Sequence, residues 1–315
     1  ASIFLACLTH VPIFADTLLS PLGRSIGPNS SVVALTEVNP SGENADRPDG
    51  LIAVKTGNSF WTCLTEFKVG GTLEVEQVER YLKLARSLNI DAVLTISNEI
   101  VPRPEVSPVA VSGRLTQSVK LFHISWMQIL SHLQLLIATD LIDDSNHQMI
   151  VKEFIRFLVH SSTGIKGFEQ MPEEWSSIVN ACRDRMKLTK SGVSEQHVVE
   201  GWMQEERELA FILSSQTGSP TSVIRRKKQK TSHQEIVDSH LEDLTQNSLL
   251  TCSINVKEAA APIHVMLDLQ SRSIRISLEL QAPTDRSQAR SCVTWLARQL
   301  PQNDLTGIDV EADWP

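Results

Sequence analysis

The fold is decided by residues 47–68, which read RPDGLIAVKTGNSFWTCLTEFK. Two apolar runs, 51–54 and 60–64, lie on either side of the pair Gly57-Asn58. A Gly-Asn pair between two strand-like runs indicates a short hairpin, because glycine supplies the positive φ that a two-residue turn needs. The stretch therefore predicts two antiparallel strands joined by a tight turn.

Two acidic residues stand at equal distances from this turn. Asp49 and Glu66 would face each other across the hairpin with Cβ atoms roughly 5 Å apart, and Lys68 would be a diagonal neighbour on the same face. Two carboxylates and an ammonium group on one face are costly unless a metal ion neutralises the acids. Oxygen ligands of this kind suit Mg²⁺ or Mn²⁺, so the hairpin predicts a site for one of these ions.

The segments around the hairpin predict an α/β core. Their patterns indicate an amphipathic helix over 3–20, a strand over 31–38, a helix over 73–88, and strands over 91–97 and 119–124. From Ser125 the sequence predicts helices over 125–139, 146–160, 172–187 and 194–214, with Ser125 and Ser194 as N-caps. The tail predicts strands over 263–269 and 273–280 and a helix from Pro283 to Leu300.

These elements group into four parts. We expect a core over 1–125, a helical accessory region over 126–214, a polar basic linker over 215–240, and a small α+β domain over 241–315. The linker carries the basic run 225–230, which could contact phosphate groups or be a solvated charge cluster.

Composition narrows the class of protein. A length of 315 residues, 41% hydrophobic and 21% charged residues are ordinary for a globular protein with a large core. The net charge of −8 argues against a protein that coats nucleic acid non-specifically. The five cysteines form no zinc spacing or dense disulfide framework, so we expect a cytoplasmic protein. The apolar N-terminal stretch has no basic residue before Arg24, so it lacks the basic start of a signal peptide, and it is too short and polar for a membrane span. Because the chain opens on Ala1, we expect it to be a fragment.

The order helix, three strands, helix, strand resembles the PD-(D/E)XK nuclease superfamily, with Pro48-Asp49 and Glu66-Phe67-Lys68 as the two halves of its motif. The helix that follows adds a QxxxY pattern, Gln77 to Tyr81, similar to that of the RecB-type branch. The resemblance covers residues 1–125 and implies a restriction-endonuclease-like fold, a mixed sheet flanked by helices.

The resemblance also implies a metal-ligand set. Asp49 and Glu66 would bind the Mg²⁺ or Mn²⁺ ion, together with the backbone carbonyl of Phe67. Glu37, at the end of the first strand, would be an additional acidic ligand, although a glutamate at a strand end is as well explained by solvation.

Three further side chains would act on the substrate. Lys68 would orient or deprotonate the attacking water and stabilise the phosphate in the transition state. Gln77 would hold the strand or the metal-bound water, and Tyr81 would contact a substrate phosphate. Taken singly, the ExK and PDG motifs are weak signals, since PDG is also a turn signal.

The sequence therefore predicts a metal-dependent nuclease that hydrolyses DNA, in genome defence or repair, with a homodimer as a further expectation. The alternative is an inactive protein of the same fold that binds nucleic acid or a protein partner. An intact Asp49, Glu66 and Lys68 set favours the enzyme, because a binding protein has no need of all three.

Overall fold

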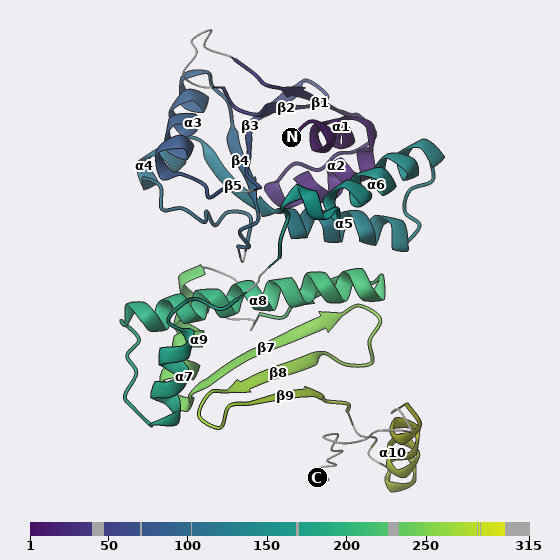
Figure 1. Cartoon of the computed structure of the whole chain (residues 1–315). Helices are drawn as coiled ribbons and strands as arrows, with labels where there is room; N and C mark the ends of the chain where they lie inside the picture. The colour runs from purple at the N-terminus through teal and green to yellow at the C-terminus, as the bar shows by residue number, and fades with distance from the viewer. Residues whose placement is uncertain are drawn as a thin grey trace.

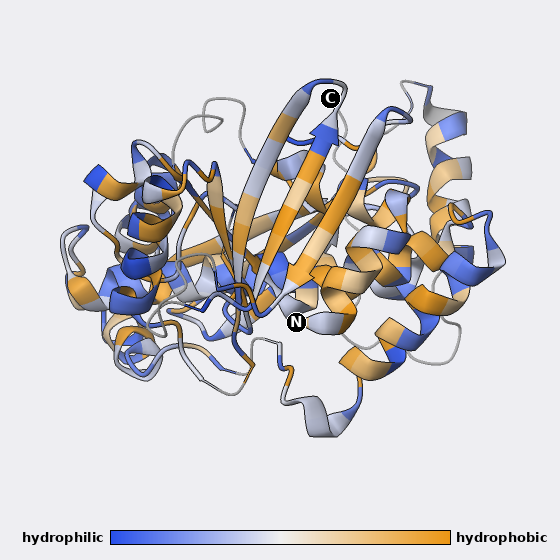
Figure 2. Cartoon of the chain, turned by 90° about the horizontal axis from the view of Figure 1, so that it is seen from above, coloured by the Kyte–Doolittle hydropathy of each residue, from blue (hydrophilic) through white to orange (hydrophobic). Residues whose placement is uncertain are grey.

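The computed structural model describes residues 1–39, 47–69, 71–101, 103–167, 170–225, 233–281, 283 and 285–299. Its first part is a five-stranded mixed sheet flanked by helices, in the order β1-β2-β3-β4-β5 (Figure 1). The strands are β1 (Ser30–Thr36), β2 (Gly50–Thr56), β3 (Ser59–Phe67), β4 (Ala92–Ser97) and β5 (Lys120–Ser125). Seen from above, the strands in the middle of the molecule are mainly apolar and the turns that join them mainly polar (Figure 2).

The hairpin has the predicted register. In the antiparallel pair β2–β3, Gly50 is paired with Thr65 and Thr56 with Ser59. Gly57 adopts a φ of +58°, the left-handed conformation that the short turn requires. The paired residues end at Gly50 and Thr65, immediately before Asp49 and Glu66, which the sequence predicts to lie opposite each other.

The second half of this sheet is parallel. Helix α3 (Val75–Ser87) connects β3 to β4, and both β3–β4 and β4–β5 are parallel pairs. Every residue of β4 is buried, which is typical of a central strand covered on both faces. The short helix α4 (Gly113–Thr116) precedes β5 and lies beside α3 (Figure 1).

The opposite face is covered by helices from two separate parts of the chain. These are α1 (Ser2–His10), α2 (Pro12–Leu19), α5 (Trp126–Ala138) and α6 (Ser145–Leu158), with the 3₁₀ turns η1 (Ser20–Leu22) and η2 (Ser161–Thr163). The prediction of one helix over 3–20 was wrong, because Pro12 begins a second helix and the chain bends by 108° there. The predicted N-cap of α5 is confirmed: the hydroxyl of Ser125 accepts a hydrogen bond from the Gln128 N–H at 3.1 Å.

A second, antiparallel sheet of four strands lies beyond α8, in the order β6-β7-β8-β9 (Figure 1). Its elements are α7 (Trp175–Arg183), α8 (Val193–Thr217), β6 (Thr221–Val223), α9 (His233–Asn247), β7 (Leu249–Val256), β8 (Ile263–Asp268) and β9 (Ser273–Leu278). Residues from α7, α8, α9, β7 and β8 share one hydrophobic core. Helix α8 also packs on α5, where the Arg207 guanidinium donates to Gln128 Oε1 at 3.1 Å.

Several predicted boundaries shift in this second part. Helix α8 begins at Val193 with Gly192 as its N-cap, so the prediction that Ser194 caps it was wrong. The stretch predicted as a polar linker contains β6 and the start of α9. Of the basic run, Arg225 is described and 226–230 lie outside the described residues. Helix α10 (Arg286–Gln299) follows β9, and its predicted last residue, Leu300, also lies outside them.

Among the described residues, no single helix has the length and apolar character needed to cross a membrane.

Candidate functional site

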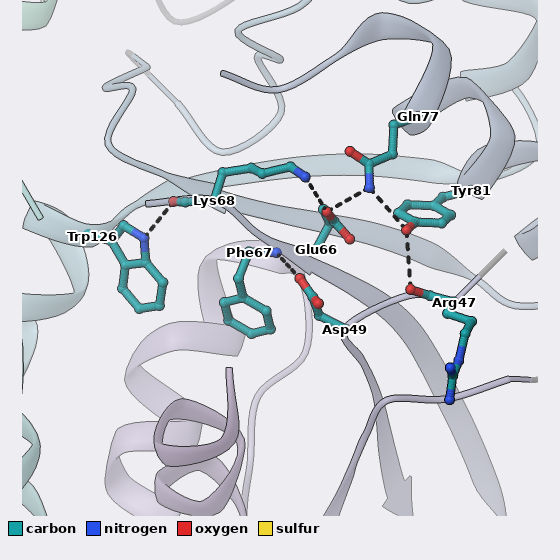
Figure 3. Close-up of polar contacts among 8 residues, drawn as sticks. All are labelled: Arg47, Asp49, Glu66, Phe67, Lys68, Gln77, Tyr81 and Trp126. Carbon is teal, nitrogen blue, oxygen red and sulfur yellow. Dashed lines mark hydrogen bonds and ion pairs between the residues drawn. The ribbon is translucent and has the colours of Figure 1, made fainter. Parts of the chain in front are cut away.

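Glu66 is the centre of the candidate site, at the end of β3 (Figure 3). Glu66 is only 3% exposed, and two nitrogen atoms contact the same oxygen of its carboxylate. Lys68 Nζ lies 3.0 Å from Glu66 Oε1, and the side-chain amide of Gln77 donates to it at 2.7 Å. The Lys68 side chain is 28% exposed, so its ammonium group can be reached from solvent while the carboxylate beside it is buried.

Burial sets the protonation behaviour of Glu66. Removal from water raises the pKa of its carboxyl, and the negative charge of Asp49 raises it further. Lys68 acts in the opposite direction through its hydrogen bond and its charge. The charge of Asp49 therefore acts on Glu66, and additional positive charge at this point would favour the carboxylate form of Glu66.

Asp49 is held by the strand that carries the other acid. Its Oδ2 accepts a hydrogen bond from the backbone N–H of Phe67 at 2.8 Å, which fixes the carboxylate beside the residue between Glu66 and Lys68. This contact uses the amide of Phe67, whereas the sequence predicted its carbonyl as a metal ligand. The structure thus brings together Asp49, Glu66 and Lys68 at one end of the hairpin (Figure 3).

The QxxxY residues link this acid to the segment before Asp49. Gln77 and Tyr81 lie one turn apart on α3, and the Gln77 amide donates to both Glu66 and the Tyr81 hydroxyl, the latter at 3.1 Å. The Tyr81 hydroxyl in turn donates to the carbonyl of Arg47 at 3.3 Å. Burial, with the negative charges of Glu66 and Asp49, raises the pKa of Tyr81 to about 12, so the hydroxyl keeps its proton. Tyr81 is 5% exposed, and its hydroxyl is engaged within the protein instead of pointing to open solvent.

Among the described residues, Glu37 is connected to the site through its backbone. Its N–H donates to the carbonyl oxygen of Asp49 at 2.9 Å, and its φ of +51° ends β1 at this point. The Glu37 side chain is exposed. In the described part of the chain, no three His, Cys, Asp or Glu side chains come together as metal ligands, so Glu37 is not grouped with Asp49 and Glu66.

Trp126 supports the site, although it was not among the predicted site residues. Its indole N–H donates to the carbonyl of Lys68 at 2.9 Å, and its ring stacks on Phe67 with centroids 5.8 Å apart. Phe4 of α1 packs edge-on against Phe67 at 5.2 Å. These contacts hold the end of β3 from the face opposite Glu66. The order of the strands could have predicted this role, because Trp126 directly follows β5, and β5 lies parallel to β4 in the same sheet.

His123 lies in the same sheet and has a structural role. Its Nδ1 is 2.9 Å from the Thr95 hydroxyl and its Nε2 is 2.8 Å from the carbonyl oxygen of Glu99, so both nitrogens are engaged. Burial lowers its pKa to about 4, which keeps the ring neutral near pH 7.

Comparisons with known proteins add no assignment to this geometry. No protein-family model matches the sequence, and neither a curated protein nor a solved structure was found to be similar to it.

Proposed function

We propose that this protein is a metal-dependent nuclease that hydrolyses phosphodiester bonds in DNA, with a site of the PD-(D/E)XK type. One observation carries the proposal: the buried Glu66 carboxylate lies between Lys68 Nζ at 3.0 Å and Gln77 Nε2 at 2.7 Å, within electrostatic reach of Asp49. Acids in a coupled, partly desolvated pair next to an ammonium group are typical of functional sites.

The arrangement of the strands in the first sheet supports the proposal. Three antiparallel strands followed by a helix and two parallel strands are the arrangement expected of a restriction-endonuclease-like core. Strand β3 pairs antiparallel with β2 on one side and parallel with β4 on the other. The acids lie at the carboxyl ends of β3 and β4, and this end of parallel strands is a common place for ligand sites.

The donor set fits Mg²⁺ or Mn²⁺. Asp49 and Glu66 supply hard carboxylate oxygens, and Mg²⁺ is usually bound by one or two carboxylates while it keeps several waters. A pair of acids is therefore sufficient for this ion, although it would be a poor site for zinc, which is held by three or four protein ligands. When bound, the ion would polarise a phosphoryl oxygen and lower the pKa of a coordinated water.

The protein's own groups would prepare the site for that chemistry. Gln77 fixes the direction of the Glu66 carboxylate, and the Phe67 amide fixes that of Asp49. Lys68, partly exposed at the edge of the site, would orient the attacking water and stabilise negative charge on the phosphate. Trp126 holds the Lys68 backbone, so the ammonium group extends from a fixed anchor.

We further infer a cytoplasmic setting and a role in genome defence or repair. The structure has five free cysteines and no disulfide among them, which suits a reducing compartment.

The test is cleavage of plasmid and linear DNA in Mg²⁺ or Mn²⁺ by the wild type and by Lys68→Ala. We expect Lys68→Ala to lose cleavage while its thermal unfolding stays close to that of the wild type. The matched control is Lys83→Ala, which removes a lysine from the exposed surface of α3, where Nζ lies 3.9 Å from Glu79. Lys83→Ala should cleave like the wild type.

Titration of Mn²⁺ separates metal binding from chemistry. Glu66→Gln keeps the shape of the side chain and should weaken Mn²⁺ binding, whereas Lys68→Ala should retain it. Equal cleavage by the wild type and Lys68→Ala would contradict the proposed site. DNA binding without cleavage by any form of the protein would favour the alternative of a non-catalytic binding protein.

A further inference from the structure

The outer strand of the second sheet exposes an unusual amount of apolar surface. Strand β9 forms one edge of this sheet (Figure 1). Ile274, Ile276 and Leu278 are 68%, 66% and 57% exposed, respectively. All three lie on one face of the strand because side chains alternate along it.

This face is the continuation of the second hydrophobic core. Ile276 is paired with Val265 of β8, which is 9% exposed and belongs to the core beneath α8 and α9. The helices therefore cover β7 and β8, and the apolar row continues uncovered onto β9. An edge strand also presents unpaired backbone N–H and C=O groups, and proteins usually protect such edges with charged side chains, lysine above all, with proline or with a bulge. The segment 273–280 contains no proline or lysine. Arg275 and Glu279 are the charged residues of this segment, and their charges are opposite.

The sequence of this edge is complementary to itself. From Ser273 to Leu280 the chain reads SIRISLEL, in which β9 ends at Leu278 and Glu279 and Leu280 follow it directly. Arg275 and Glu279 lie at equal distances on either side of Ser277. Within the described part of the chain, neither Arg275 nor Glu279 forms an ion pair, and both side chains are exposed. A second copy paired antiparallel about Ser277 would therefore place each Arg275 opposite a Glu279.

We propose that β9 pairs with β9 of a second copy of this chain, antiparallel and centred on Ser277, so that the two sheets join into one. In the dimer the strand would extend by two residues beyond Leu278. Besides the two Arg–Glu pairs, this register places Ile276 opposite Leu278 and Ile274 opposite Leu280, all on the same face. Opposite-charge and apolar cross-strand pairs are the contacts that stabilise antiparallel sheets. The interface is isologous, as expected of a two-fold dimer, and it is independent of the proposed nuclease function.

Neighbouring registers are less favourable. A shift that centres the pair on Arg275 would set arginine against arginine. A shift that places Ile276 opposite Ser277 would bring each apolar side chain to face a polar one, because opposed residues share a face of the sheet. A register centred on Ile276 sets Arg275 against Ser277 and forms no direct Arg–Glu pair.

Charge exchange tests both the interface and its register. Sedimentation equilibrium over roughly 1–100 µM, a range in which moderate affinities are resolved, should show a species of twice 35.0 kDa for the wild type. Arg275→Glu alone and Glu279→Arg alone should each weaken dimerisation roughly tenfold or more, because each sets like charges opposite each other twice. The double variant should recover wild-type dimerisation. A mixture of the two single variants should form heterodimers, since every glutamate then faces an arginine.

Two further variants test the apolar row and the two-fold centre. Ile276→Lys should give a monomer, whereas Leu141→Lys, at a residue 56% exposed after α5, should not change the association state. Ser277→Cys, in a Cys292→Ser background that removes the one cysteine that is not buried, should form a disulfide-linked dimer on mild oxidation. Ser273→Cys in the same background should cross-link far less.

A monomeric wild type across this range would overturn the proposal, including the case in which α10 of the same chain covers the strand. So would a dimer whose association is unchanged in Arg275→Glu and Ile276→Lys. A dimer weakened by both single charge variants but not restored by their combination would overturn the register centred on Ser277.

Discussion

Replacing Gly50 with alanine should destabilise the protein, although this glycine needs no unusual backbone conformation. An added Cβ would lie 2.6 Å from Leu5 Cδ1, 2.7 Å from Thr65 Oγ1 and 2.9 Å from the carbonyl oxygen of Leu35. The first neighbour is the end of a flexible side chain, but the third is backbone of β1 and cannot turn away. Gly50 is therefore required because α1 and β1 approach the strand closely.

The cost can be bounded from packing. Inserting a methyl group into a well-packed site typically costs about 1–3 kcal/mol, because neighbours must shift or leave their preferred rotamers. Gly50→Ala should lower the free energy of unfolding by this amount, which corresponds to a fall in Tm of several degrees. Since Gly50 directly follows Asp49, the shift should also weaken Mn²⁺ binding at the proposed site.

The measurement is urea unfolding followed by tryptophan fluorescence, with Gly27→Ala as the control. A Cβ at Gly27 would meet no atom within 4 Å, so this variant should unfold like the wild type. If Gly50→Ala were as stable as Gly27→Ala, the close approach of β1 and α1 to β2 would not be a constraint, and the packing argument for this glycine would be wrong.

Two other predictions concern Trp126 and Glu206. Trp126→Phe keeps an aromatic ring beside β3 but removes the hydrogen bond to the Lys68 carbonyl. It should lower the free energy of unfolding by about 1 kcal/mol and reduce DNA cleavage by more than the loss of folded protein explains. Cleavage equal to that of the wild type would show that Trp126 does not position the site. Burial raises the pKa of Glu206 to about 7, above its value in the unfolded chain, although the pairing with Arg225 at 2.6 Å opposes this shift. The native state therefore holds a proton that the unfolded chain releases, and stability should fall as pH rises from about 4.5 to 7. In Glu206→Gln the urea midpoints should fall less over this range, and identical pH slopes for both proteins would contradict the assignment.

The candidate site could be predicted from the sequence because local rules control it. A two-residue turn at Gly57 sets the register of the hairpin, and that register pairs Gly50 with Thr65, the residues next to Asp49 and Glu66. The spacing of Gln77 and Tyr81 places both on one helix face by the geometry of a single turn. None of these relations depends on distant parts of the chain.

The contacts made by these residues were harder to predict, because they depend on how the elements pack. The sequence indicated that Tyr81 lies on the site side of α3, but the approach of this helix to residue 47 determines that its hydroxyl binds a backbone carbonyl. The role of Trp126 likewise follows from β5 lying parallel to β4, which brings it near Lys68, 58 residues earlier in the sequence.

In the second sheet, a usable pattern was overlooked. Leu250, Cys252, Ile254 and Val256 alternate along β7 and are all buried, a period-two signal that predicts a strand. We placed these residues in the predicted α+β domain over 241–315 but expected strands there only over 263–269 and 273–280. The break at Pro12 is a simpler case, since proline could have been read as the start of a second helix.

The alternation of β3 connects the core to the site. Phe67 points towards Phe4 and Trp126 and is fixed there by aromatic contacts at 5.2 and 5.8 Å. Because side chains alternate along a strand, a fixed Phe67 forces Glu66 and Lys68 to the opposite face, where Gln77 meets the carboxylate. A slip of one residue would bury Lys68 among the aromatic rings and remove both charged groups from α3. The hydrophobic packing behind the sheet and the charged arrangement in front of it are therefore set by the same register.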